Sequence, residues 1–193
     1  MRVLILSCNT GGGHNACGEA IRQAFEAAGN TCVVADSLQF TSEKLSRFVS
    51  WGHTTMYRRV PRLFRFGCGY VENHPKMLRE DAAAFKLLTG GAEQLHSFLV
   101  DGGYDLVICT HVFSGLLLRK TLDVYSMPIK SAFVATDYTC SPGVANSKLD
   151  VYFIPDESLA EEFLSGGVPG WKLAASGMPV LSGFYARGNK DSA

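Results

Sequence analysis

The chain has 193 residues, 47% of them hydrophobic, which is enough for one or two small domains with an apolar core. Disorder and a small disulfide-stapled fold are therefore excluded. The 18 Lys and Arg residues balance 18 Asp and Glu residues, so the chain lacks the positive excess of a nucleic-acid-binding protein. No apolar run is long enough to span a membrane, and Val3 to Leu6 is too short for a signal peptide, which predicts a cytoplasmic protein.

The cysteines are scattered, and no two of them have CxxC spacing. Most lie inside apolar segments, which is typical of reduced, buried thiols and indicates neither disulfides nor a zinc site. The six cysteines are Cys8, Cys17, Cys32, Cys68, Cys109 and Cys140.

The first elements in chain order are a strand, a glycine turn and a helix. Arg2 to Ser7 is an apolar run typical of a buried parallel strand, and the glycines at 11–13 end it. From His14 onward, apolar residues recur at helical spacing until Gly29. The sequence therefore predicts a strand that ends near Cys8 and a helix that begins directly after the glycines.

Strands and helices then alternate to the end of the chain. This alternation predicts an α/β fold with a parallel, doubly wound sheet whose active edge is at the carboxyl ends of its strands. The expected strands are 31–36, 105–109, 129–135, 151–154 and 172–175. The expected helices are 41–66 with interruptions near Gly52 and Pro61, 75–100, 112–119 and 157–164.

Positive charge is concentrated between Lys44 and Arg79, where eight basic residues accompany one acidic residue, Glu72. Bulky aromatic residues alternate with these arginines, a pattern that suits the headgroup region of an anionic membrane. An ordinary helix with a solvated basic face would show the same composition. The candidate membrane contacts are Arg58, Arg59, Arg62, Arg65, Trp51, Phe64 and Phe66.

The glycine turn is a candidate anion site, because backbone N–H groups at the start of a helix attract negative charge. The candidate residues are Asn9, Thr10, Gly11, Gly12 and Gly13. With Ala16 and Asp36 the same turn loosely matches a dinucleotide-binding fingerprint, but no Lys-Ser or Lys-Thr follows it as in a Walker loop.

Polar residues follow three of the expected strands and should converge at one edge of the sheet. His14 follows the glycines and could accept a proton from a hydroxyl group, unless it only caps the helix or contacts a phosphate. His111 follows the third strand. Asp137 follows the fourth, where it could orient His14, bind a sugar or glycerol hydroxyl, or simply cap a turn.

These motifs and their order resemble the monogalactosyldiacylglycerol synthase and processive diacylglycerol glucosyltransferase family from residue 2 to about 185. The opening Ser7-Cys8-Asn9-Thr10-Gly11-Gly12-Gly13-His14 resembles the family's glycine loop, and Cys109-Thr110-His111-Val112-Phe113 its Thr-His-Pro-Phe stretch. Thr136-Asp137-Tyr138 resembles its Thr-Asp motif, and Ser176-Gly177-Met178-Pro179-Val180 its Gly-x-Pro-Val segment.

The resemblance implies the amino-terminal, acceptor-binding half of a GT-B glycosyltransferase, whose two Rossmann-like domains face each other. Such an enzyme passes a hexose from a UDP-sugar to a diacylglycerol-type lipid hydroxyl. His14 then corresponds to the base and Asp137 to a second catalytic residue, and the cleft residues are His111, Thr136, Tyr138 and Pro179. No cofactor or metal is expected beyond the UDP-sugar donor.

Residues 1–185 are expected to form the acceptor domain, and residues 186–193 a tail or the start of a linker to a nucleotide-sugar domain. Without that domain the chain is expected to be inactive. The resemblance also implies a peripheral location on the inner face of the cell membrane. One departure affects acceptor recognition: Cys140-Ser141-Pro142-Gly143-Val144 lacks the family's His-Pro and following aromatic residue.

Two other classes of protein fit the sequence. A non-catalytic lipid- or partner-binding module would keep the fold without the chemistry, and a NAD(P)-binding domain would use Gly11, Gly13, Ala16 and Asp36. The sugar, the acceptor lipid, processivity and the oligomeric state stay open at this point.

Overall fold

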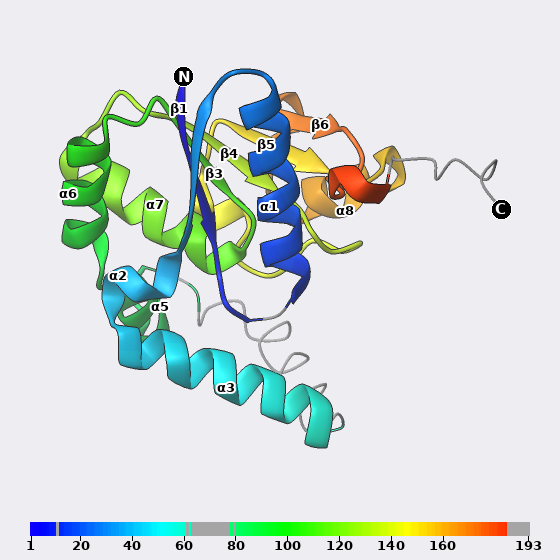
Figure 1. Ribbon diagram of the computed structural model, residues 1–193. Helices are drawn as coiled ribbons and strands as arrows, with labels where there is room; N and C mark the ends of the chain where they lie inside the picture. The colour runs from blue at the N-terminus through cyan, green and yellow to red at the C-terminus, as the bar shows by residue number, and fades with distance from the viewer. Residues whose placement is uncertain (11, 61, 63–77, 79, 185–193) are drawn as a thin grey trace, which may run out of the picture.

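The protein is built on one parallel six-stranded sheet in the order β2-β1-β3-β4-β5-β6 (Figure 1). The computed structural model describes residues 1–10, 12–60, 62, 78 and 80–184. All five pairs of neighbouring strands are parallel, which confirms the predicted fold class. The strands are β1 (Arg2–Ser7), β2 (Thr31–Asp36), β3 (Leu106–Cys109), β4 (Lys130–Val134), β5 (Val151–Ile154) and β6 (Leu173–Ala175).

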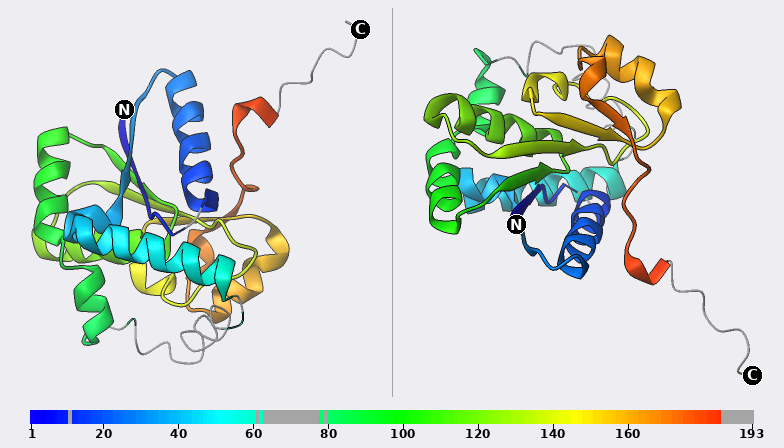
Figure 2. Two further views of the ribbon diagram at one scale, coloured as in Figure 1. Left: turned by 60° about the horizontal axis from the view of Figure 1, so that its bottom comes forward. Right: turned by 90° about the horizontal axis from the view of Figure 1, so that it is seen from above.

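Helices cover both faces of the sheet (Figure 2). Helix α1 packs on one face, and α5, α6, α7 and α8 supply buried residues to the other. The described helices are α1 (Gly12–Ala27), α2 (Ser37–Thr41), α3 (Glu43–Arg59), α5 (Ala83–Leu88), α6 (Ala92–Gly102), α7 (Val112–Tyr125) and α8 (Ala160–Ser165). Short 3₁₀ turns are η2 (Ala145–Ser147), η3 (Glu157–Leu159), η4 (Gly170–Lys172) and η5 (Ser182–Phe184).

Strand β1 shows why the sequence of a central strand is uniformly apolar. Val3 and Ile5 belong to the core beneath α1, whereas Leu4 and Leu6 belong to the core beneath α7, and all four are fully buried. Successive side chains of a strand point to opposite faces, so a strand covered on both sides needs an apolar residue at each position.

The direction in which the chain winds changes at β1. The chain moves from β1 to β2 on one side, and then crosses to β3 on the other side of β1. The carboxyl ends of β1 and β3 therefore flank a topological switch point, where open α/β sheets bind their ligands. The glycine turn at residues 9–13, called the glycine loop from here on, follows β1 at this point, and Thr110 and His111 follow β3.

Two helix predictions are wrong in detail. Helix α3 runs through Gly52 without interruption, because an isolated glycine weakens a helix by only about 1 kcal/mol. The space around Gly52 is open, since a Cβ atom added there would have no neighbour within 4 Å. The helix expected over residues 75–100 is two helices in the described region, α5 and α6, separated at Gly90 and Gly91. Pro61, the second expected interruption, lies outside the described residues.

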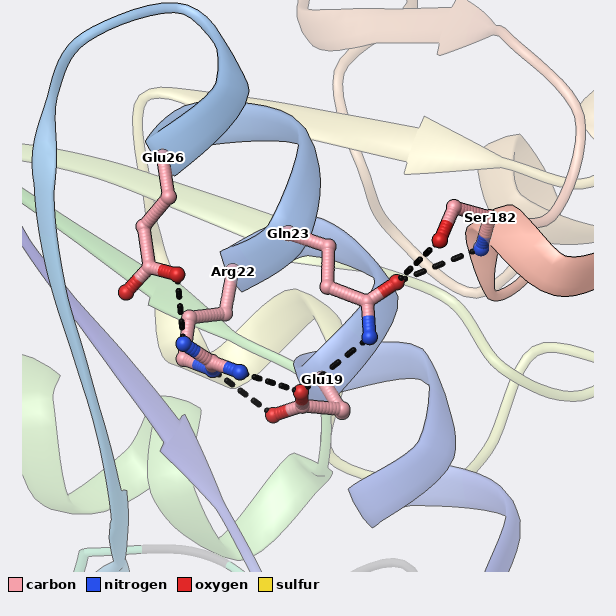
Figure 3. A network of polar contacts seen from close by, with 5 residues as sticks. All are labelled: Glu19, Arg22, Gln23, Glu26 and Ser182. Carbon is pink, nitrogen blue, oxygen red and sulfur yellow. Dashed lines mark hydrogen bonds and ion pairs between the residues drawn. The ribbon is translucent and has the colours of Figure 1, made fainter.

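The segment after β6 returns to helix α1. The backbone N–H and the hydroxyl of Ser182 both donate to Oε1 of Gln23, at 3.2 and 2.9 Å (Figure 3). Beside them, Arg22 bridges Glu19 and Glu26 along the helix. Arg22 and its two partners are largely exposed to solvent, so these ion pairs stabilise α1 only weakly. The boundary predicted at residue 185 lies outside the described residues.

The described cysteines fit the prediction of reduced thiols. Cys8, Cys17, Cys32, Cys109 and Cys140 are all free, and the first four are buried. Burial raises the pKa of the Cys8 and Cys17 thiols to about 12, so both stay protonated and unreactive at neutral pH. Cys68 lies outside the described residues.

Candidate functional site

Three strand ends bring their polar groups together around the imidazole of His14. Nδ1 of His14 lies 3.0 Å from the carbonyl oxygen of Thr110 and 2.6 Å from the hydroxyl oxygen of Thr136. His14 is in the first turn of α1 after β1, Thr110 follows β3, and Thr136 follows β4. The predicted convergence at the carboxyl edge of the sheet is therefore present.

The contacts at Nδ1 determine which nitrogen of His14 carries the proton. A carbonyl oxygen can only accept a hydrogen bond, so Nδ1 must donate to Thr110 and carry the hydrogen. The hydroxyl of Thr136 can then accept from the same N–H and donate to the Thr110 carbonyl, 3.4 Å away. Neutral His14 accordingly has its lone pair on Nε2, which is the nitrogen that can accept a proton from a substrate.

His111 has the opposite arrangement. It is the N-cap of α7, and its Nδ1 accepts a hydrogen bond of 3.1 Å from the backbone N–H of Phe113. Neutral His111 therefore carries its hydrogen on Nε2. The His14 and His111 rings meet edge-on, with centroids 4.6 Å apart. The site thus pairs an imidazole that can accept a proton with one that can donate a hydrogen bond.

A small pocket joins these groups. It has a volume of about 30 Å³, and its lining includes His14, His111, Thr136, Asp137 and Ser141. This volume fits about one water molecule, so a substrate would bind across the mouth of the pocket rather than inside it. Ser141 belongs to the segment that departs from the family pattern, and sequence reasoning did not place it at the site. Thr110 was likewise missed, because a backbone carbonyl carries no signal in the sequence.

Three of the predicted site residues, Asp137, Tyr138 and Pro179, make no hydrogen bond to His14. Asp137 lines the pocket but makes no contact with His14, and the groups that orient the imidazole are Thr110 and Thr136 instead. In the bend after β4, Thr136 is half-buried against His14, whereas Asp137 is exposed. Tyr138 is 69% exposed. Pro179, in the segment after β6, is half-buried and does not line the pocket.

The glycine loop leaves open space at the start of α1. A Cβ atom added to Gly12 or Gly13 would meet nothing within 4 Å, so packing does not require glycine at either position. Asn9 is exposed and accepts a hydrogen bond from Asn15, whereas Thr10 is turned inward and buried. The prediction for Thr10 concerned the backbone of the loop, and burial of its side chain leaves that prediction untested. Gly11 lies outside the described residues.

Asp36, the acidic residue of the NAD(P) alternative, has structural contacts. One carboxylate oxygen of Asp36 caps α2 by accepting from the N–H of Leu38 at 3.1 Å, and the other accepts from the hydroxyl of Ser46. Each oxygen of Asp36 therefore has a structural partner, and the carboxylate links the start of α2 to α3.

Part of the basic segment lies on α3, which extends beneath the carboxyl edge of the sheet in Figure 1. Its exposed side chains include Trp51 and Phe48, and Arg59 and Arg62 are exposed as well. Arg58 is also part of α3, whereas Phe64, Arg65 and Phe66 lie outside the described residues. Within the described residues, no helix combines the length and apolar character needed to cross a bilayer.

A metal centre has no candidate in the described part of the chain, where no three His, Cys, Asp or Glu residues are grouped suitably. The expectation that the reaction needs no metal stays a prediction.

Thr136 is predicted to position His14. Replacing Thr136 by valine removes the hydroxyl but keeps the shape, so kcat should fall about tenfold while KM changes little, as expected for the loss of one hydrogen bond. Thr136→Ser, which restores a hydroxyl, should recover most of the activity in steady-state assays of the full-length gene product. Equal losses in both variants would contradict a role for the hydroxyl.

The fold of the chain resembles about half of one solved structure. It matches a solved structure described as "lipopolysaccharide outer core galactosyltransferase WaaB apo form", with a TM-score of 0.53 and 11% sequence identity. The match covers 91% of this chain and 45% of the galactosyltransferase. At this identity the likeness shows the fold alone, a Rossmann-like domain of the GT-B type.

Sequence comparison identifies the family. The model of the monogalactosyldiacylglycerol (MGDG) synthase family matches residues 14–180, and the chain belongs to this family. A "Processive diacylglycerol beta-glucosyltransferase" of Bacillus cereus (strain G9842) is 24% identical over 195 residues, with 98% of this chain and 48% of the relative covered. A "Probable monogalactosyldiacylglycerol synthase, chloroplastic" of Nicotiana tabacum is 27% identical over 191 residues, with 95% and 35% covered.

These findings confirm the resemblance described above. The chain spans about half the length or less of the curated relatives it matches. The family and the fold are thereby established.

Proposed function

We propose that the chain is the acceptor-binding half of a hexosyltransferase that moves a sugar from a UDP-sugar to the hydroxyl of a diacylglycerol-type lipid. It would act as a peripheral protein on the cytoplasmic face of an anionic membrane. The observation that carries this proposal is the 3.0 Å contact between Nδ1 of His14 and the Thr110 carbonyl oxygen, which favours a hydrogen on Nδ1 and leaves Nε2 to accept a proton.

The proposed step uses groups at the switch point. The lipid hydroxyl attacks the anomeric carbon of the sugar, its proton passes to Nε2 of His14, and the bond from the sugar to UDP breaks. The negative charge of the departing diphosphate lies near the start of α1, where the helix dipole is positive and Gly12 and Gly13 leave space for its approach. Asp137, exposed at the pocket, is available to bind an acceptor hydroxyl.

The donor is expected to bind mainly to a second domain. Because relatives are about twice as long as this chain, we expect residues 1–193 alone to give no measurable transfer. The test of the function is an assay of the full-length gene product with UDP-glucose or UDP-galactose and diacylglycerol in vesicles. Glycolipid formation supports the proposal, whereas vesicle binding without transfer supports the non-catalytic binding module.

Membrane binding is predicted to depend on the arginines around the end of α3. Replacing Arg59 and Arg62 together by alanine should weaken binding to vesicles that contain phosphatidylglycerol by about 30-fold, since each basic residue near such a surface contributes about 1 kcal/mol. Co-sedimentation measures the effect. A matched control is the pair Lys120→Ala and Lys130→Ala, which removes the same charge from exposed sites outside the basic segment. An equal loss in the control would refute a localised membrane contact.

A further inference from the structure

One carboxylate of helix α8 is bonded to the segment that follows β4. Oε1 of Glu162 accepts a hydrogen bond of 2.5 Å from the hydroxyl of Thr139 and one of 2.8 Å from the backbone N–H of Cys140. These partners lie 23 and 22 residues before Glu162 in the chain. We refer to residues 135–144, between β4 and η2, as the β4 loop. Glu162 therefore joins two parts of the chain that are distant in the sequence.

The β4 loop forms much of the small pocket beside His14. Thr136, Asp137, Thr139 and Ser141 all line this pocket. The contact with Glu162 at residues 139 and 140 thus lies in the middle of the stretch that lines the pocket. Any change in this contact should be felt by the residues on either side of it.

The loop has few other attachments along this stretch. Residues 136–140 make no backbone-to-backbone hydrogen bond with any residue that the structure describes. Ala135 is held by the carbonyl oxygen of Phe153, and Thr136 by its side-chain contacts with His14 and Thr110. Between Thr136 and Ser141, the described hydrogen bonds of the loop are the two that Glu162 accepts.

The carboxylate projects from a helix that is itself anchored. Phe163, the next residue of α8, is fully buried and also lines the pocket. At the end of α8, a Cβ atom added to Gly166 would lie 2.9 Å from Sγ of Cys140, so the helix packs closely against the β4 loop. Glu162 can therefore fix the loop relative to the rest of the pocket wall.

The ionised form of Glu162 suits this task. The hydrogen bond from Thr139, and then the one from Cys140, lower the pKa of the Glu162 carboxyl below its ordinary value. The group is therefore an anion at neutral pH and accepts from both donors. Glutamine would keep an acceptor oxygen without the charge, whereas alanine would remove both. Glu161, the preceding residue, is exposed but makes no hydrogen bond to the loop within the described part of the chain.

We propose that Glu162 is a positioning residue that sets the affinity for the acceptor by holding Asp137 and Ser141 at the pocket. The role in acceptor binding rests on the proposed function, in which Asp137 binds an acceptor hydroxyl. The contacts that orient His14 come from Thr110 and from Thr136 at the start of the loop, and they do not involve Glu162. Glu162 therefore acts on acceptor binding and not on proton transfer.

The first experiment separates KM from kcat in the full-length gene product. With diacylglycerol in vesicles as the varied substrate, Glu162→Ala should raise KM about fivefold and leave kcat nearly unchanged. Glu162→Gln should restore KM, because its amide oxygen accepts the same two hydrogen bonds. Glu161→Ala, which removes the same charge from the neighbouring position, should leave both constants unchanged. A residue that only stabilised the fold would lower the amount of active protein, and so kcat, without changing KM.

The second experiment measures the loop directly and needs no transfer. Amide hydrogen exchange of residues 1–193, followed by NMR, reports how often the Cys140 N–H is released from its acceptor. Exchange at Cys140 should be at least about fivefold faster in Glu162→Ala, and should be unchanged in Glu162→Gln and Glu161→Ala.

Unchanged exchange at Cys140 in Glu162→Ala would overturn the proposal, and so would a loss of kcat at constant KM. Equal effects of the alanine and glutamine variants would assign the effect to charge and also overturn it. Absence of transfer by the unmodified full-length product would refute the proposed function instead, and the role in acceptor binding with it. The exchange measurement would then still show whether Glu162 holds the β4 loop.

Discussion

Replacing His14 by alanine is expected to lower kcat for lipid glycosylation by about a thousandfold, within the range that general base catalysis contributes. The reason is that the one nitrogen poised to accept the acceptor proton, Nε2, is lost with the ring. The affinity for the lipid should change little, because the substrate binds across the mouth of a pocket that stays open. Steady-state assays of the full-length gene product measure both quantities.

A matched histidine provides the control for this variant. His96 of α6 is also half-buried and stacks on Tyr125, with ring centroids 3.9 Å apart, but it does not line the pocket. His96→Ala should therefore keep normal turnover. Loss of the hydrogen bond from His14 to Thr110 costs about 1 kcal/mol of stability, so thermal melting should show that His14→Ala stays folded. Near-normal turnover of His14→Ala would refute its assignment as the base.

The largest effect on stability is expected at Gly91, where α6 begins against the end of α2. An added Cβ atom would lie 2.4 Å from the carbonyl carbon of Phe40 and 2.5 Å from the backbone nitrogen of Thr41. Backbone atoms cannot move aside as a flexible side chain can, so α2 and α6 must separate. We expect Gly91→Ala to lower the free energy of unfolding by about 3 kcal/mol and the Tm by about 10 °C.

The same substitution at Gly52 should change the free energy of unfolding in the opposite direction. Gly52 lies inside α3, and a Cβ atom there meets nothing within 4 Å. Alanine favours a helix interior by about 1 kcal/mol over glycine, so Gly52→Ala should stabilise the protein slightly. Urea unfolding of the two variants compares these effects directly. A stable Gly91→Ala protein would show that the contact between α2 and α6 is looser than described.

The sheet was predictable because each central strand is buried on both faces. The runs from Arg2 to Ser7 and from Val151 to Ile154 appear as strands with the predicted bounds. Parallel strands end at a common edge, so the sequence predicted that His14, His111 and Asp137 lie near one another, and all three line one pocket. Helix breaks were less predictable, because the close contacts that distinguish Gly91 from Gly52 come from α2, which is distant in the sequence.

The orientation of side chains within the site was not predictable. Thr136 and Asp137 are adjacent, and orienting His14 was one of the roles that the sequence left open for Asp137. The turn after β4 directs the hydroxyl inward instead, and the partner that fixes the tautomer is the backbone carbonyl of Thr110. Asp36 was similarly open to a ligand role until its contacts with Leu38 and Ser46 were located.

The most direct test of this account is the tautomer of His14 in the folded chain. Long-range ¹H–¹⁵N NMR distinguishes the two nitrogens of a neutral imidazole, and the His14→Ala and His111→Ala variants assign the signals. The account predicts that neutral His14 carries its hydrogen on Nδ1, as its contact with Thr110 requires, and that His111 carries its hydrogen on Nε2. A hydrogen on Nε2 of neutral His14 would contradict the proposed base.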